Sequence, residues 1–442
     1  MTSEASSSLE TSLASIAPTP KSIGILILCV VVAACEGYDV QAMAIAAPLL
    51  AKSWTLVPKQ IGMLLTASVL GIVVGSLVFA PSGDRIGRRP ATLLGIALAA
   101  LFTGISAFAP DIPTLLVVRV LAGIGLGLAI PNVIAIAMET SPRSWKTFAV
   151  LMVSCGYPLG TGLMAPLASY LATTYGFQGV FLLGAASTGL AFILTVFWLP
   201  ESPWILVRSG NHRRLERLLR ALGIQNAGET SFSASPKENR RVSRKALFAP
   251  DIRRTTLLLW LLNFAGICVI YFFVSWLPSL LSYRGMGGPQ AIIATAIFNA
   301  AGVAGALIMA ISLRRYGATT VLACTYAAAV VGTLTLALVP TAGSSFLACV
   351  AFTGMAITGS QFALTAVVNH VYPAEIRVTA AGYALGVGRI GAVLAPIAGT
   401  VAVQLSSSPE QVFMITAVPC FLALATTLLL RKEARIQALR LN

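Results

Sequence analysis

The chain has 442 residues, of which 57% are hydrophobic and only 10% are charged, and its mean hydropathy is +0.86. This composition excludes a soluble globular protein and indicates a protein that crosses a membrane many times. The formal net charge is +15, but no basic motif interleaved with aromatic residues indicates a nucleic-acid partner.

Apolar stretches of about 20 residues span a bilayer as helices, and the sequence predicts twelve of them. In chain order they are residues 22–50, 60–82, 91–109, 113–138, 147–172, 178–199, 255–283, 290–311, 318–339, 344–369, 378–404 and 411–430. The predicted fold class is an all-α membrane protein with two six-helix bundles. Its predicted parts are a tail at 1–21, a bundle at 22–199, a central loop at 200–254, a bundle at 255–431 and a tail at 432–442.

The positions of the basic residues predict how the chain is oriented, because lysine and arginine in short loops mark the cytoplasmic side of a membrane. Only Lys52, Lys59 and Arg284 fall in loops on the side opposite the termini. Arg119 and Arg389 fall within spans. All other lysines and arginines lie on the side of the two termini, so we expect both tails and the central loop to be cytoplasmic.

The first span contains two carboxyl groups, Glu36 and Asp39. Ionisable side chains inside a membrane are typical of functional sites, because a low dielectric favours the neutral carboxyl and lets proton uptake drive a conformational change. Three residues apart on a helix, the two acids share a face and disfavour joint ionisation. Gly37 between them is expected to permit a local break in the helix. The alternative is that one acid is merely neutralised by a neighbouring arginine or by hydrogen bonds.

Two motifs follow in the predicted second to fourth spans. The loop after the second span reads Gly83-Asp84-Arg85-Ile86-Gly87-Arg88-Arg89. The fourth span contains Arg119 followed by glycines at 123, 125 and 127. Glycines at this spacing inside an apolar helix favour close helix packing and are weak evidence for nucleotide binding.

The central loop is polar, and its first part, Arg208 to Leu222, is predicted to form an amphipathic surface helix. Ala227 to Arg244 is predicted to be a flexible linker. The seven cysteines lie in apolar spans without paired or metal-ligand spacing. Neither a disulfide framework nor a zinc site is therefore expected.

The two halves of the sequence repeat each other, as in transporters built from parallel repeats. Gly156 to Pro166 aligns with Gly386 to Pro396 at an offset of 230 residues, which places Arg389 at the position of Leu159. The 83–89 loop aligns with residues 312–318. In that alignment Leu313 stands where the acid would be, and the second copy is degraded.

With these motifs, the chain resembles the major facilitator superfamily over its whole length. The resemblance implies two six-helix bundles around a central cavity that opens alternately to each side. Glu36-Gly37-Tyr38-Asp39 also resembles the acidic-Gly-x-Asp motif in the first helix of the aromatic acid/proton symporters, in particular the hydroxyphenylpropionate and hydroxybenzoate carriers. Supporting segments are Pro200 to Pro203, Leu247 to Pro250 and Gly388 to Ala392. Two departures are Glu36, where aspartate is commoner, and Leu313.

The resemblance implies that Glu36 and Asp39 couple protons to transport. It also implies that Arg119 belongs to the same network or to a charge pair between packed helices. Arg389 is the expected partner of an anionic substrate, because a guanidinium binds a carboxylate through two parallel hydrogen bonds. The alternative for Arg389 is a permanent ion pair with Asp39 or Glu36.

The family pattern further implies a cytoplasmic gate, in which Asp84 lies between helix ends and nearby arginines and stabilises the outward-facing state. Ordinary anchoring by basic residues at the membrane surface is the alternative. The predicted gate residues are Asp84, Arg85, Arg88, Arg89, Glu139, Arg143 and Arg377, with Glu375 as a further inner-face charge and His370 as an interfacial side chain.

An aromatic substrate would require flat apolar walls and a few hydrogen-bonding groups. Amides inside a membrane are costly unless they face a partner or a cavity, whereas membrane aromatics more often serve in packing. Chosen by span and residue type, the candidates are Tyr38, Gln41, Asn263, Tyr271, Asn299, Gln361 and Tyr383, with Tyr157, Phe298 and Asn132 as further possibilities.

We therefore predict a proton-coupled secondary transporter that imports an aromatic carboxylate by alternating access across a bacterial inner membrane. Its expected partners are a small organic anion, protons and the lipid bilayer. No metal, organic cofactor or nucleic acid is expected, and a monomer suffices. No catalytic motif indicates an enzyme.

Several other functions remain open at this point. One is a carrier of the same fold for a sugar or a non-aromatic anion, since Pro200 to Pro203 is shared with sugar carriers; intramembrane Arg389 favours an anion. Another is a drug/proton antiporter, although Gly156 to Gly160 lacks the Gly-Pro pair of that group. A receptor that binds a nutrient without transporting it is disfavoured by the modest central loop and short tail.

Overall fold

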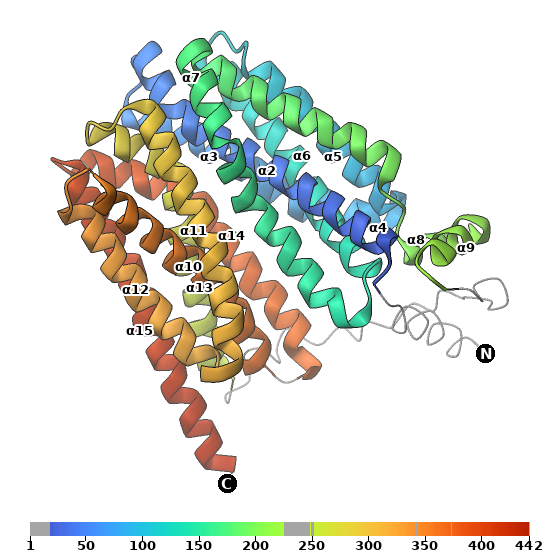
Figure 1. Cartoon of the computed structure of the whole chain (residues 1–442). Helices are drawn as coiled ribbons and strands as arrows, with labels where there is room; N and C mark the ends of the chain where they lie inside the picture. Colours follow the sequence, from blue (N-terminus) through green and yellow to red (C-terminus); the bar gives the residue numbers. More distant parts are fainter. Residues whose placement is uncertain (1–17, 225–247, 249–251, 342, 373, 442) are drawn as a thin grey trace. The chain divides into compact units, whose positions relative to one another are not determined.

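The computed structural model describes residues 18–224, 248, 252–341, 343–372 and 374–441, and every regular element in these ranges is helical. The long helices (Figure 1) are α2 (Pro20–Ser53), α3 (Pro58–Val74), α5 (Arg88–Ser106), α6 (Ile112–Glu139), α7 (Lys146–Trp198), α10 (Arg253–Tyr283), α11 (Gly288–Tyr316), α12 (Ala318–Leu338), α13 (Ser344–Val371), α14 (Ala374–Leu405) and α15 (Pro409–Leu441). The short elements are η1 (Gly75–Phe79), η2 (Ala80–Ser82), α4 (Gly83–Ile86), η3 (Arg143–Trp145), α8 (Pro203–Arg208) and α9 (His212–Ala221).

In the part of the chain that the structure describes, ten helices are long and apolar enough to cross a membrane. One of them, α7, has 53 residues and is broken at Gly176, where φ is +63°. A glycine adopts this left-handed conformation without steric cost, so the chain reverses there with almost no loop. Each predicted span begins within about one helical turn of an observed helix start or of the Gly176 break. The all-helical fold class is confirmed.

The helix α2 is continuous from Pro20 to Ser53, so the break that we expected at Gly37 is wrong. Gly37 instead allows α2 and α7 to approach each other closely, because a Cβ atom at this position would overlap the backbone oxygen of Tyr157. Gly160 of α7 meets the backbone oxygen of Ala34 in the same way. These glycines let the two backbones pack without intervening side chains.

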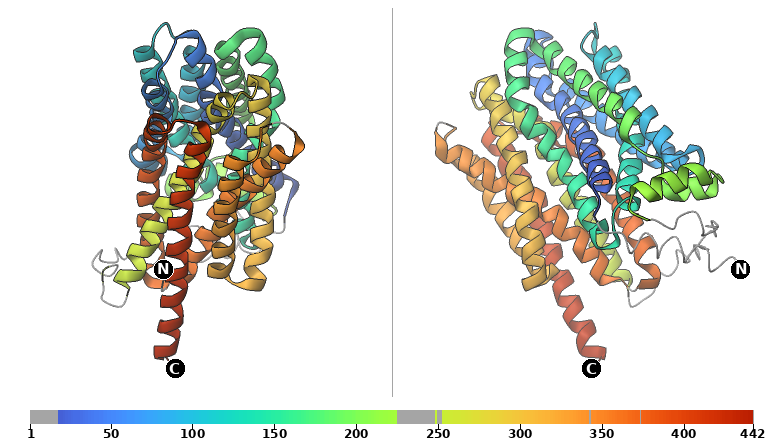
Figure 2. Two further views of the ribbon diagram at one scale, coloured as in Figure 1. Left: turned by 90° about the vertical axis from the view of Figure 1, so that its left-hand side faces the viewer. Right: turned by 45° about the vertical axis from the view of Figure 1, so that its right-hand side comes forward.

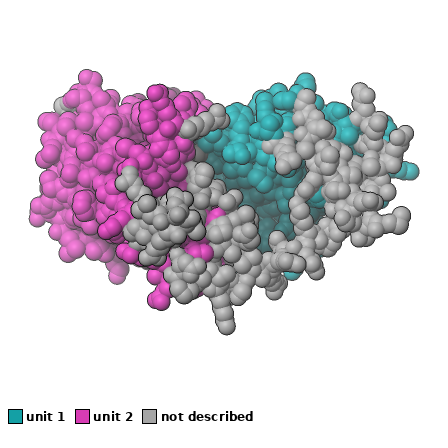
Figure 3. Space-filling view, turned by 90° about the horizontal axis from the view of Figure 1, so that it is seen from below, with its two compact units in different colours: residues 1–42, 67–160, 181–239 teal, residues 43–66, 161–180, 240–442 magenta. Residues whose placement is uncertain are grey.

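Internal contacts divide the chain into two compact units, shown in different colours in Figure 3. The first unit is formed by residues 1–42, 67–160 and 181–239, and the second by residues 43–66, 161–180 and 240–442. Four of the boundaries fall within α2, α3 and α7. Segments from the N-terminal half of the sequence, 43–66 and 161–180, therefore pack with the C-terminal helices.

The glycine run of α6 holds the core of the first unit together. A Cβ atom on Gly123 would overlap the backbone oxygen of Ser68 in α3, and Gly127 meets the backbone oxygen of Ile72 in the same helix. On the other side of α6, Gly125 faces Gly95 of α5. The predicted packing role of these glycines is confirmed, because alternate positions allow α6 to approach two neighbours.

A turn at the end of α4 fixes the register of the internal repeat. Gly87, between α4 and α5, has φ +107°, and Gly317, between α11 and α12, has φ +77°. Both glycines form a turn with positive φ between two helices. They are 230 residues apart, which is also the offset between Gly156 and Gly386. Our alignment of this loop was one residue out of register, so Arg314, and not Leu313, stands at the position of Asp84 in the sequence.

The predicted amphipathic helix is present but begins later than expected. Gly210 turns the chain with φ +65°, and the Asn211 side chain accepts a hydrogen bond from the backbone N–H of Arg214 at 3.3 Å, which caps α9. Leu215 and Leu219 are buried, whereas Arg213 is exposed. In Figures 1 and 2, α8 and α9 lie beside the end of α7. The linker predicted at 227–244 lies outside the described residues.

Stacked rings and an arginine stabilise the second unit. Phe273 of α10 and Phe298 of α11 stack with ring centroids 5.4 Å apart, so Phe298 serves in packing. Arg284, predicted in a loop at the face opposite the termini, donates to Glu410 at 2.9 Å and to the carbonyl oxygens of Leu336 and Val339. This arginine therefore joins the ends of α10, α12 and α15.

Candidate functional site

An ion pair is fully buried in the middle of the first unit. Asp39 of α2 and Arg119 of α6 lie 3.2 Å apart between Oδ1 and Nη1, and both side chains are completely inaccessible. Arg119 also donates through Nη2 to the backbone oxygen of Asp39, at 3.1 Å, and through Nε to the hydroxyl of Ser68, at 3.0 Å. The guanidinium lies 5.5 Å from the ring centroid of Phe181. We call Asp39, Ser68, Thr103 and Arg119 the Asp39 cluster.

Thr103 of α5 completes the coordination of the carboxylate. Its hydroxyl lies 2.8 and 2.7 Å from the two oxygens of Asp39, to which it donates, and it accepts from Nη1 of Arg119 at 3.2 Å. Gly184 of α7 leaves room for this arrangement, since a Cβ there would lie 3.1 Å from Thr103 and 3.6 Å from Asp39. A buried ion pair is stable only when its remaining hydrogen-bonding capacity is also satisfied.

The structure thus pairs Asp39 with Arg119, one of the two roles expected for that arginine. Asp39 is neutralised, but by Arg119 and not by Arg389. Ser68, Thr103, Gly184 and Phe181 were missed in the sequence. The only signal for Ser68 and Thr103 was a small hydroxyl residue within an apolar span, and most such residues merely bond to their own helix.

Glu36 differs from Asp39 although it lies one turn away on the same helix. Its residue is 8% exposed, whereas Asp39 is completely buried. Among the described residues, its carboxylate takes part in no ion pair and no hydrogen bond. The two acids of the first span therefore occupy different chemical environments.

The 83–89 loop forms a second polar cluster, which includes several predicted gate residues. Arg88 lies 2.6 Å from Glu139 at the end of α6 and 3.5 Å from Asp84. Ser202 donates to Glu139, and Arg208 donates to the backbone oxygen of Asp84 at 3.3 Å. The loop, the end of α6 and the start of α8 are therefore held together by charge-assisted hydrogen bonds.

Glu201, like Ser202 and Arg208, belongs to this cluster although the sequence did not reveal it as a site residue. One of its carboxylate oxygens accepts from the backbone N–H groups of Arg88, at 2.9 Å, and Arg89, at 3.2 Å. A carboxylate at this place satisfies free N–H groups at the start of α5 and interacts favourably with the helix dipole. Arg85 is exposed. The side chains of Arg143, His370, Glu375 and Arg377 lie outside the described part of the structure.

Asn132 proves to be a structural residue at the same end of the molecule. Its amide donates to the backbone oxygens of Ala80, at 3.2 Å, and Leu128, at 2.9 Å. A Cβ atom on Gly83 would overlap its side-chain oxygen. Asn132 therefore holds the chain close to α6 where the 83–89 loop begins.

The candidates in the second unit occupy several different places. Arg389 of α14 is half-buried, and Tyr271 of α10 lies near enough to interact with it electrostatically. Asn263 and Asn299 are buried, and each donates to the carbonyl oxygen four residues earlier in its own helix, at 2.9 Å. Tyr383 stacks on Trp260, with centroids 6.2 Å apart.

The remaining candidates are Gln361 in the second unit and Tyr38, Gln41 and Tyr157 in the first. Gln361 and Tyr326 both face Gly266, where a Cβ atom would meet both of their polar ends. Tyr38 and Gln41 are completely buried on α2. Tyr157 packs against a small apolar core of Val40, Ala99 and Leu126.

Comparison with known proteins identifies the family. The sequence model of the Major Facilitator Superfamily matches residues 29–384 and 280–440. The chain belongs to the major facilitator superfamily. It is therefore a multi-pass membrane protein, in agreement with its apolar helices.

Two relatives and one solved structure support this assignment. The chain is 31% identical over 417 residues to a gallate transporter of Pseudomonas putida, covering 94% of this chain and 92% of that protein. It is 32% identical over 411 residues to the 3-(3-hydroxy-phenyl)propionate transporter of Escherichia coli (strain K12), covering 93% and 94%. A partially occluded inward open structure of the xylose transporter XylE from E. coli matches with a TM-score of 0.73 at 16% identity, over 92% and 97% of the chains, which shows the shared fold. The predicted family resemblance is confirmed, and both relatives are named as transporters and not as enzymes.

Thr103→Val should destabilise the first unit, because it removes a hydroxyl from a buried charge pair while preserving shape. Leaving charged groups without a hydrogen bond costs about 1–3 kcal/mol, so we expect a lower midpoint of thermal unfolding in detergent. The matched control is Thr195→Val, because among the described residues the buried hydroxyl of Thr195 bonds only to the carbonyl of Ala191 in its own helix. Equal midpoints for the two variants would show that Thr103 contributes nothing specific to the Asp39 cluster.

Proposed function

We propose that the chain imports an aromatic carboxylate together with protons by alternating access. The relatives named for gallate and 3-(3-hydroxy-phenyl)propionate support this class of substrate, because each of these molecules combines a hydroxylated aromatic ring with a carboxylate. The single observation that carries the proposal within this chain is the contrast between its two intramembrane arginines. Arg119 is neutralised by Asp39, whereas no described carboxylate forms an ion pair with Arg389.

Arg389 is therefore assigned to the substrate carboxylate. A cation held inside a membrane domain without a protein counterion is costly unless a ligand or water compensates its charge. Tyr271 beside it supplies a hydroxyl and an aromatic face, which suit a hydroxylated aromatic acid. Gln361, Tyr383, Asn263, Asn299, Tyr38 and Gln41 remain candidates for contacts with the ring and its substituents.

Glu36 is assigned the transported proton. Asp39 is already satisfied by Arg119 and Thr103, so a change in its charge would leave a buried arginine without a partner. No described residue forms an ion pair with Glu36, so its carboxylate can gain or lose a proton without breaking one. In this proposal Asp39 and Arg119 keep the helices in place. The charge on Glu36, one turn away, changes the electrostatic energy of this ion pair.

The finer architecture belongs to the same proposal. The kinked helix α7 supplies the fifth and sixth of twelve spans, and the repeat offset of 230 residues relates two six-helix bundles. The distribution of basic residues supports cytoplasmic termini, and the bacterial relatives support a bacterial inner membrane. The coupling ion is the proton, no metal or organic cofactor is required, and one chain forms the working unit.

The 83–89 loop is assigned to the cytoplasmic gate, with Asp84, Arg88 and Glu139 as its charged members. Glu201 joins them because it binds the start of α5. Gating would break or form the hydrogen bonds that link this loop to α6 and α8. In this proposal these few contacts are made in one state of the transporter and broken in the other.

Contacts in the second unit join helices from the two halves of the sequence. A Cβ atom on Gly62 of α3 would overlap the Thr400 hydroxyl of α14, and one on Gly162 of α7 would lie 3.7 Å from Ala296 and Ala300 of α11. Gly62 lies near the start of α3, at the opposite end of that helix from the 83–89 loop, and Thr400 lies near the end of α14. We infer that the side away from the cytoplasm is closed.

Uptake into liposomes tests the substrate assignment. An inward proton gradient should drive liposomes that contain the purified protein to accumulate a labelled hydroxybenzoate or hydroxyphenylpropionate. Arg389→Ala should weaken substrate binding about tenfold to a hundredfold, since it removes a charge-assisted hydrogen bond. Arg315→Ala, at an exposed arginine, is the control. Uptake of xylose in preference to aromatic acids would contradict the proposal, and binding without flux would indicate a receptor.

Glu36→Gln tests the proton assignment. A permanently neutral side chain mimics the protonated carrier, so exchange of labelled for unlabelled substrate should continue while gradient-driven accumulation is lost. Asp39→Asn should reduce both activities and lower the thermal stability, because it leaves Arg119 without its counterion. If Glu36→Gln still accumulated substrate at the wild-type level, the proton would have to be carried elsewhere.

A crosslink tests the inferred closed side. Cysteines replacing Gly62 and Thr400 would place their Cβ atoms about 3.0 Å apart, so a small separation would give the roughly 3.5–4.5 Å of a disulfide. Oxidation of the double variant should stop transport, and a reductant should restore it. Each single variant controls for the native cysteines, which are free. Full transport by crosslinked protein would rule out a role for this contact in gating.

A further inference from the structure

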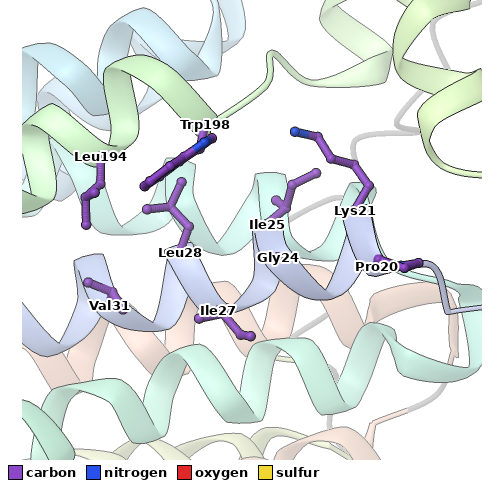
Figure 4. Close-up of a pocket in the computed structure, with 9 residues that line it drawn as sticks. All are labelled: Pro20, Lys21, Gly24, Ile25, Ile27, Leu28, Val31, Leu194 and Trp198. Atoms are coloured by element: carbon purple, nitrogen blue, oxygen red, sulfur yellow. The ribbon is translucent and has the colours of Figure 1, made fainter.

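Two cavities in the first unit share one lining residue, Lys21, near the start of α2. The first is an apolar groove of about 340 Å³ between α2 and the end of α7. Figure 4 shows Lys21 on the same side of α2 as Leu28, Leu194 and Trp198. One end of an otherwise apolar groove is therefore positively charged.

The groove has the properties of a site for a hydrocarbon chain. Gly24 leaves open space in its floor, because a Cβ atom there would meet nothing within 4 Å. Ile27 is 58% exposed and Trp198 is 59% exposed. A half-exposed tryptophan at the end of a membrane span is typical of the boundary between headgroups and acyl chains. An apolar chain lying between Leu28 and Leu194 would cover this surface.

The second cavity, of about 380 Å³, lies between the start of α2, the start of α5 and the helix α9. Four cations line it, namely Lys21, Arg89, Arg214 and Arg217, against one acid, Glu201. That acid already accepts hydrogen bonds from two backbone N–H groups of α5. The Nε–H of Arg89 is buried and has no hydrogen-bond partner among the described residues. The cavity is therefore lined by four cations and one acid, and one donor of Arg89 is unused although its Nη2 donates to the backbone oxygen of Val196.

We propose that the two cavities together hold one anionic glycerophospholipid. Its phosphate lies against Lys21, Arg214 and Arg217, and one acyl chain follows the groove past Gly24 and Leu28. A ligand with an anionic head and a long apolar tail is the chemistry that a cationic cavity beside an apolar groove recognises. A zwitterionic lipid would bring its own cation into the cavity and bind more weakly.

A third cavity provides an internal contrast. It lies in the second unit, has a volume of about 420 Å³, and is lined by Met309, Tyr316, Cys324 and other uncharged residues. A lipid chain there would bind without regard to the charge of its headgroup. The proposal rests on the membrane location of the chain and is independent of the transported substrate, so the two can fail separately.

The test is the thermal unfolding of the delipidated full chain in detergent, with phosphatidylglycerol or with phosphatidylcholine of the same acyl chains. Phosphatidylglycerol should raise the unfolding midpoint at lower lipid concentration than phosphatidylcholine, and native mass spectrometry should detect one retained lipid per chain. Inorganic phosphate should have no effect. Arg217→Gln should weaken the lipid effect about fivefold, the value of one basic residue near an anionic surface.

Three further variants separate the head site from the tail site. Gly24→Leu should fill the groove and abolish the preference, and Lys21→Gln should weaken it without altering the folded core, since Lys21 is exposed. Arg213→Gln, at an exposed arginine of α9 outside the cavity, and Cys324→Leu, in the uncharged cavity, are the controls and should leave the preference unchanged.

Three results would overturn the proposal. Equal stabilisation by the two lipids would show that the cations do not recognise the headgroup. An effect of inorganic phosphate equal to that of phosphatidylglycerol would show a simple anion site. An unchanged preference in both Gly24→Leu and Lys21→Gln would show that the lipid binds elsewhere.

Discussion

A buried ion pair in a membrane domain imposes strict requirements on the helices around it. Neither water nor lipid can complete the coordination of Asp39 and Arg119, so each remaining donor and acceptor must find a protein partner. Those partners come from α2, α3 and α5, and they reach Arg119 only because α6 packs closely against its neighbours through Gly123, Gly125 and Gly127. The glycine run and the charge pair are therefore parts of one arrangement.

This arrangement makes the two acids of α2 unequal, and in the proposed mechanism the inequality gives the first helix two separate tasks. Asp39 is locked to Arg119 and fixes how α2 packs against α5 and α6. Glu36 keeps a carboxylate whose charge can change without dismantling that packing. A transporter needs both properties, because a proton site that also held the helices together could not change its charge without weakening the fold.

The all-helical, multi-pass character of the chain could be predicted from the sequence because long apolar runs are a property of composition along the chain. The packing role of the α6 glycines was also predictable from their spacing. The partners of the polar side chains were not, since they depend on how each helix is rotated about its axis, and helices that are apolar on all sides carry almost no periodic signal of that rotation. For the same reason Thr103 could not be distinguished from Thr195. Glu201 is separated from the start of α5 by more than a hundred residues, so its role as a cap could not be predicted either. Gly37 was predicted to break α2, whereas it allows α2 and α7 to pack closely.

The reversal at Gly176 has a mechanical consequence. Because the two arms of α7 are joined by a single glycine turn and not by a loop, their adjoining ends cannot slide past each other and must move together. The ends that adjoin Gly176, residues 161–180, belong to the second unit, whereas the rest of both arms belongs to the first. A movement of one unit against the other would therefore have to bend the arms of α7. The turn also offers almost no slack for an inserted tag or for cleavage by a protease.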